Sequence, residues 1–138
     1  MPGLTGIDLV FVYGTLRPAV AHAAAARHLL REAQVLGPAT VAGRLYLLSW
    51  YPGLVAARAA GDQVRGDLLA LPAGSSLLKA LDAYEGYDPA VPAASPFRRE
   101  CREVTGPQGR VAAWLYAWHG PLEGARRIPS GDFISWEG

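Results

Sequence analysis

Glycine and proline interrupt this chain at hairpin-length spacings, and most of the segments between them have the composition of short strands. The 138 residues include 16 glycines and 11 prolines. Apolar runs bounded by such residues are typical of β-strands joined by tight turns. The clearest hairpin turn is the Gly-Pro-Gln-Gly sequence at 106–109. We expect strands over residues 7–13, 40–50, 54–57, 64–71, 97–104 and 110–118.

Two segments are typical of helices. Residues 19–33 are rich in alanine and leucine, which are good helix formers. In residues 77–84, apolar side chains recur on one helix face, with Ser75 as N-cap and Gly86 as the residue just past the end. Several strands with only two helices predict an α+β domain on a curled, mixed or largely antiparallel sheet.

The connecting segments carry recognisable turn and loop signals. Gly37-Pro38 is expected to stop the first helix or turn the chain, Tyr51-Pro52-Gly53 to form a turn, and Gly61-Asp62 to form a hairpin turn. Three prolines make residues 87–96 an irregular loop. The tail, residues 120–138, has little periodicity.

Composition narrows the class of protein. A chain of 138 residues, 51% of them hydrophobic, is expected to form one globular domain over residues 1–138. With a net charge of +1, the chain shows no basic stripe of the kind that nucleic-acid-binding proteins carry. Cys101 is the single cysteine, which fits a reducing compartment. With no signal peptide and no long apolar run in evidence, we expect a cytoplasmic protein that does not enter a membrane.

The loop that follows the first predicted strand is a candidate anion site. Tyr13-Gly14-Thr15-Leu16 leads from that strand toward the first predicted helix. Glycine permits a sharp turn and close approach of a ligand, and successive backbone N–H groups in such a turn converge on an anion. The alternative is an ordinary strand-to-helix connection.

Glu85 is the candidate acid–base residue. It stands at the end of the second predicted helix, where the negative end of the dipole disfavours a carboxylate. A carboxylate shielded between Tyr84 and Tyr87 would have a raised pKa, suited to proton transfer near neutral pH. The alternative is a solvated glutamate at a frayed helix end.

Three other groups of residues bear on a possible site. Arg98 and Arg99 are adjacent on a predicted strand and so face opposite sides, which lets one of them, and we favour Arg99, point into the site. The alternative is that both are surface charges. The sequence Ser130-Gly131-Asp132 suits a local turn. The three histidines lack metal-ligand spacing, so no metal site is expected.

Taken in order, these segments resemble the γ-glutamylcyclotransferase superfamily, also called the AIG2-like family. The resemblance spans nearly the whole chain. It departs from the family pattern at Phe97, where a tyrosine is frequent, at Phe133, where a tryptophan is common, and in the proline-rich stretch 88–96. The matching pieces are residues 12–17, 43–46, 51–54, 66, 81–87, 97–99, 114–116 and 128–133.

The resemblance implies a compact, mixed, mainly antiparallel β-barrel flanked by a few helices. It implies that the loop from Tyr13 to Leu16 binds the glutamyl portion through main-chain amides, that Arg99 and Tyr116 add substrate contacts, and that Glu85 is the acid–base residue. The implied reaction is cyclisation of a γ-glutamyl group to 5-oxoproline with release of an amine, without metal or organic cofactor. The expected assembly is a monomer or weak homodimer.

Two other classes of function stay open from the sequence. One is a non-catalytic module on the same scaffold that binds a carboxylate-bearing metabolite. The other is an interaction protein that uses surface tryptophans such as Trp50 and Trp136.

Overall fold

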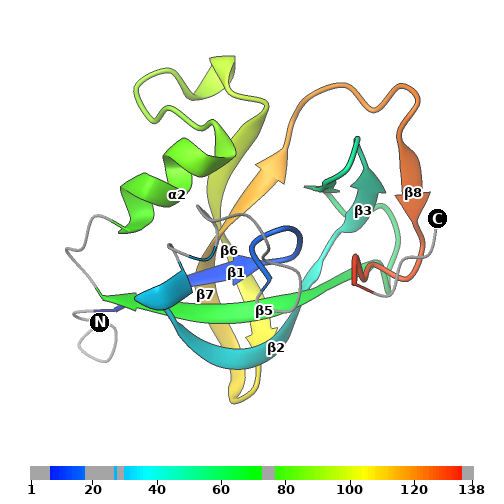
Figure 1. Ribbon diagram of the computed structural model, residues 1–138. Coiled ribbons are helices and arrows are strands. Elements are labelled where there is room, and N and C mark those ends of the chain that lie inside the picture. Colours follow the sequence, from blue (N-terminus) through cyan, green and yellow to red (C-terminus); the bar gives the residue numbers. More distant parts are fainter. Residues whose placement is uncertain (1–6, 18–26, 28–29, 73–76, 135–138) are drawn as a thin grey trace.

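The computed structural model describes residues 7–17, 27, 30–72 and 77–134. In this part of the chain, eight strands form one sheet, accompanied by helix α2 (Leu77–Glu85) and the short 3₁₀ helix η2 (Pro92–Ala94) (Figure 1). The strands are β1 (Ile7–Val12), β2 (Gln34–Ala42), β3 (Arg44–Leu47), β4 (Pro52–Val55), β5 (Gln63–Pro72), β6 (Phe97–Gly106), β7 (Gly109–Trp118) and β8 (Arg126–Ile128).

Five of the strands close into a barrel. They follow the order β1, β5, β2, β6, β7, with antiparallel neighbours, and β1 closes the ring by a parallel pairing to β7 in which Val10 lies opposite Trp114. Strands β4, β3 and β8 continue the sheet beyond β7. The predicted α+β class and the mixed, mainly antiparallel barrel are therefore confirmed.

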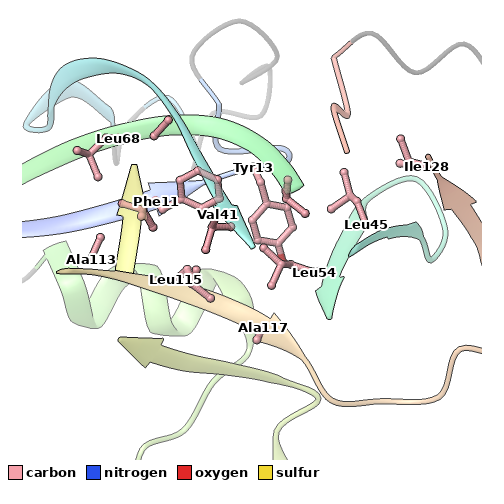
Figure 2. Close-up of a cluster of buried hydrophobic side chains, with 13 residues drawn as sticks. Phe11, Tyr13, Val41, Leu45, Leu54, Leu68, Ala113, Leu115, Ala117 and Ile128 are labelled. Atoms are coloured by element: carbon pink, nitrogen blue, oxygen red, sulfur yellow. The ribbon is translucent and has the colours of Figure 1, made fainter. Parts of the chain in front are cut away.

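Side chains alternate between the barrel interior and its outer face, as strand geometry requires. Figure 2 shows interior residues such as Phe11, Val41 and Leu115 packed toward one another. Outward-facing neighbours on β1 and β7, among them Val10 and Tyr116, form a second cluster with apolar residues of α2. The helix thus covers one outer face of the barrel (Figure 1).

The sequence prediction was wrong at Gly37-Pro38, which lie inside β2. The register between β2 and β5 shifts between Val35 and Gly37, and Gly37 has φ +139°. This irregularity accommodates a proline within a strand, because a bulge tolerates a residue that lacks the N–H donor.

Other boundaries also differ from the predictions. Residues 40–50 hold the end of β2 and all of β3, with a bend at Gly43 between them and a turn over residues 48–50. A Cβ on Gly43 would lie 2.9 Å from the Val55 carbonyl oxygen, so the bend favours glycine. Pro52 and Gly53 begin β4, and the turn before them is closed by the Leu48 N–H donating to the Tyr51 carbonyl at 3.0 Å. Strand β8 was missed because its three residues are too short to show periodicity.

The hairpin between β6 and β7 and the end of α2 at Gly86 are confirmed. Ser75 and most of the predicted helix over 19–33 fall outside the described residues, although residues 27, 30 and 31 are helical. Within the described ranges, no helix has the length and hydropathy needed to cross a bilayer.

Candidate functional site

A cavity of about 430 Å³ lies where three segments distant in sequence meet. The first is the loop after β1, the second is the end of α2, and the third is the turn between β3 and β4. One site therefore joins the two strongest candidates from the sequence. The described lining residues are Phe11, Val12, Tyr13, Gly14, Thr15, Leu16, Trp50, Tyr51, Pro52, Ala83, Tyr84, Glu85, Gly86, Phe97 and Tyr116.

The loop after β1 turns tightly against β4. The Arg17 N–H donates to the Gly14 carbonyl at 2.9 Å, which closes the turn. A Cβ on Gly14 would lie 2.8 Å from Cγ of Pro52, so only glycine fits. The N–H groups of Gly14, Thr15 and Leu16 take part in no turn, loop or cap hydrogen bond among the described residues. Buried N–H groups normally have partners, so these three are candidate donors to a ligand.

Arg17 fixes this loop to the rest of the fold. The Arg17 side chain is almost fully buried, with its Nε 2.9 Å from Asp67 of β5 and its Nη1 2.9 Å from Asp132. The Arg65 N–H also donates to the Gly131 carbonyl at 2.7 Å. The turn predicted at Ser130-Gly131-Asp132 therefore lies behind the loop and supports it.

The Tyr13 side chain points into the barrel core. Its hydroxyl donates to the Tyr116 carbonyl at 2.6 Å and accepts from the Leu54 N–H at 3.2 Å. Burial, followed by the Glu85 carboxylate, raises the pKa of this hydroxyl, so it stays protonated. Tyr13 reaches the cavity at the start of the loop, while its hydroxyl joins strands.

The end of α2 places Glu85 by a defined cap. Gly86 adopts φ +72°, its N–H donates to the Ala83 carbonyl at 3.2 Å, and the Tyr87 N–H donates to the Asp82 carbonyl at 2.8 Å. These bonds form a Schellman motif, which ends a helix with a glycine in the left-handed region. Glu85 is consequently held at the last helical position instead of fraying into solvent.

Burial raises the pKa of the Glu85 carboxyl to about 7. The residue as a whole is half-buried, and it lines the cavity. No hydrogen bond or ion pair of this carboxylate occurs within the described ranges. A carboxyl with that pKa exchanges protons readily near neutral pH.

A buried polar chain fixes α2 against β6 and β7. The Tyr116 hydroxyl donates to Asp82 at 2.7 Å, and Arg99 lies 3.3 Å from the other Asp82 oxygen. The Arg99 guanidinium also stands 4.8 Å from the Trp114 ring centroid. Burial and then the Asp82 hydrogen bond raise the pKa of Tyr116. Glu85, one turn beyond Asp82, takes its position from this contact.

Arg99 is not among the described residues that line the cavity, whereas its strand partner Tyr116 is. The substrate contact expected of Arg99 stays a prediction, and in the structure its guanidinium pairs with Asp82. The expected alternation of the arginine pair is observed, since Arg98 instead donates to the carbonyls of Ser95 and Ala93.

Aromatic residues form the remaining wall. The Trp50 and Tyr51 rings meet edge-on, with their centroids 5.1 Å apart. The ring centroid of Phe97 lies 6.0 Å from that of Tyr51 and 4.9 Å from that of Trp118. Thr15 and Tyr84 join the loop to α2 through a hydroxyl–hydroxyl contact of 3.1 Å.

Comparison with known proteins agrees with this architecture. The sequence profile of the family described as "Gamma-glutamyl cyclotransferase, AIG2-like" matches residues 10–136. The chain belongs to this family. The matched region contains the loop after β1, the end of α2 and both strands that carry Tyr116 and Arg99.

Individual relatives of the γ-glutamylcyclotransferase family support the assignment. The "Gamma-glutamylcyclotransferase family protein YtfP" of Escherichia coli strain K12 is 29% identical over 126 residues, which are 91% of this chain and 95% of that protein. The solution structure of E. coli YtfP has a TM-score of 0.64 at 28% identity, covering 92% of this chain and 96% of that one.

Two further structures share the fold at lower identity. YkqA from Bacillus subtilis has a TM-score of 0.68 at 21% identity, covering 92% of this chain but only 39% of that longer one. An AIG2-like protein from Mus musculus has a TM-score of 0.63 at 20% identity, covering 83% of this chain and 78% of that one. Family membership supports a γ-glutamylcyclotransferase-like enzyme class.

Sequence reasoning missed several residues of this family member's site. Asp82 carries no local signal, because an aspartate on a short helix is ordinarily solvated. Tyr84 was expected only to shield the Glu85 carboxylate on the apolar face of the helix, and Tyr51 only to form a turn. Trp50 was considered only as an interaction residue, and Trp136, considered with it, falls outside the described part of the chain.

Proposed function

We propose that the protein cyclises the γ-glutamyl group of a small γ-glutamyl amine or peptide to 5-oxoproline and releases the amine. The observation that carries this proposal is the position of Glu85, which borders the same cavity as the loop from Tyr13 to Leu16. A carboxyl with pKa about 7, without a fixed partner in the described chain, suits a group that takes and returns a proton.

In the proposed reaction the substrate supplies its own nucleophile. The Glu85 carboxylate takes a proton from the α-ammonium, and the freed amine attacks the γ-carbonyl carbon to form the ring C–N bond. The tetrahedral intermediate then collapses: Glu85 returns its proton to the leaving nitrogen as the bond to that nitrogen breaks. The ring nitrogen loses its second proton to become the lactam N–H, and the released amine takes up that proton as an ammonium ion. Protons balance over the cycle, and one carboxyl serves as base and then as acid.

The loop amides would hold the substrate in its reactive pose. The unused N–H groups of Gly14, Thr15 and Leu16 are suited to the α-carboxylate or the developing oxyanion. A flexible γ-glutamyl chain must bend for ring closure, so holding its carboxylate contributes through proximity. Tyr13 and Tyr116 are poor proton donors to the reaction, since both hydroxyls have raised pKa values and committed partners.

The test is direct. The protein is incubated with a panel of γ-glutamyl amines and γ-glutamyl amino acids, and 5-oxoproline is measured by chromatography. The proposal expects 5-oxoproline and free amine in equal amounts from at least one compound. Folded protein that binds a panel member without forming product would instead indicate the carboxylate-binding module.

A further inference from the structure

Three of the residues that line the cavity, Trp50, Tyr51 and Phe97, form a continuous aromatic wall. Phe97 and Trp118 are register partners, two positions beyond the Arg99–Tyr116 pair and on the same face of the hairpin. Phe97, and with it the wall of Trp50, Tyr51 and Phe97, therefore lies next to Tyr116, whose hydroxyl contacts Asp82. A γ-glutamyl group held at the loop and Glu85 would direct its amide substituent toward this wall.

We infer that the leaving amine is an apolar or aromatic amine without a carboxylate, packed against Trp50, Tyr51 and Phe97. This inference rests on the proposed function and adds the chemical class of the released group. It predicts that the protein prefers substrates that release an amine over substrates that release an amino acid.

Charge is the first reason for this choice. Among the described lining residues there is no lysine, arginine or histidine, and the one acid is Glu85. A second carboxylate on the leaving group would enter an apolar cavity near Glu85 without a counter-charge, which is unfavourable.

The arginines near the site are already engaged. Arg17 is paired with two aspartates, and Arg99 is paired with Asp82. Arg98 donates to the carbonyls of Ser95 and Ala93, outside the cavity lining. A leaving-group carboxylate would have to break one of these contacts to gain a cation.

The exposure of Trp50 is the second reason. Its side chain is 71% exposed, yet it borders the cavity and touches Tyr51 edge-on. A large apolar ring that projects at a cavity edge gains contact area when an apolar ligand packs on it. Because the rings of Trp50, Tyr51 and Phe97 contact one another in series, an apolar ligand could pack against ring edges and ring faces all along the wall.

Matched substrates test the inference. The first pair is γ-glutamyl-phenethylamide and γ-glutamyl-phenylalanine, and the second is γ-glutamyl-ethylamide and γ-glutamyl-alanine, so each pair differs by one carboxylate. We expect kcat/KM for 5-oxoproline release to favour the carboxylate-free member of each pair at least about tenfold, as an unpaired charge predicts. Equal or higher kcat/KM for the amino acid members would overturn the inference and leave the cyclotransferase proposal standing.

A variant tests the wall itself. Trp50→Ala should lower kcat/KM for the phenethylamide about fivefold more than for the ethylamide, since it removes the aromatic contact. Val91→Ala changes another exposed apolar side chain, 53% exposed and outside the lining, and should preserve both values. Equal loss on both amides in Trp50→Ala would overturn the role of the wall. Absence of product from all four compounds would instead remove the proposed function.

Discussion

The hydroxyl of Tyr13 donates a hydrogen bond of 2.6 Å to the main-chain carbonyl of Tyr116, where β7 passes from pairing with β1 to pairing with β4. The same hydroxyl accepts from the Leu54 N–H of β4 at 3.2 Å. Tyr13 thereby bridges β7 and β4 at this junction, and it links the barrel to the segment that carries the aromatic wall.

Replacing Tyr13 with phenylalanine should destabilise the protein. The substitution leaves the buried Tyr116 carbonyl and Leu54 N–H without their partner, which costs about 1–3 kcal/mol. Urea unfolding measures the change in the free energy of unfolding. Tyr51→Phe is the matched control, since its hydroxyl makes no hydrogen bond within the described chain. Equal stability of both variants would contradict the bridging role.

Gly14→Ala should lower both stability and activity. The added methyl would lie 2.8–2.9 Å from the Pro52 ring, and overpacking of this kind costs about 1–3 kcal/mol. The loop would shift relative to Glu85, so kcat/KM should fall. Adding Pro52→Ala removes the contacted ring atoms and should restore part of both losses, which a double-mutant cycle measures. Additive losses would show that the clash is not the cause.

The elements predicted correctly from the sequence are those specified locally. Gly86 ends α2, and the glycines at 106 and 109 bound the β6–β7 turn. These features could be predicted because a glycine determines the backbone conformation of its immediate neighbours in sequence. Strand β8 and the split at Gly43 depend on β3 lying between β4 and β8, a pairing that local patterns do not encode.

The candidate site also has parts with local sequence signals and parts that depend on tertiary contacts. Glu85 and the loop after β1 could be predicted, because a helix end and a strand end each have local signals. The contact of Asp82 with Tyr116 and Arg99 could not be, since it joins α2 to β6 and β7 only after the barrel closes. Arg99 pairs with Asp82 in this contact and is not among the described residues that line the cavity.

Glu85→Gln should stabilise the protein more at high pH than at low pH. The raised pKa, about 7, means that the folded state binds a proton more tightly than the unfolded state. Wild-type stability therefore falls as pH rises from about 4.5 to about 7, and the amide lacks this penalty. Urea unfolding at pH 5 and pH 8 should show the advantage of the variant growing by about 1–3 kcal/mol. A constant difference would contradict the raised pKa.

The activity of the wild-type protein should rise with pH through about 7. Glu85 must be ionised to take the proton, so kcat/KM should fall about tenfold per pH unit well below its pKa of about 7. Samples held at each pH and returned to pH 7.5 should recover full activity, which separates titration from unfolding. A flat profile between pH 5 and pH 8 would indicate a different base.

The most direct test of the account is the rate of 5-oxoproline formation by Glu85→Gln. The amide keeps the shape of the side chain but cannot accept and return a proton, so we expect kcat to fall at least about 100-fold with the fold intact. Glu103→Gln, an exposed residue of β6 outside the cavity, is the matched control and should retain wild-type kcat. Folded Glu85→Gln protein that forms 5-oxoproline at the wild-type rate would contradict the central claim that Glu85 transfers the proton.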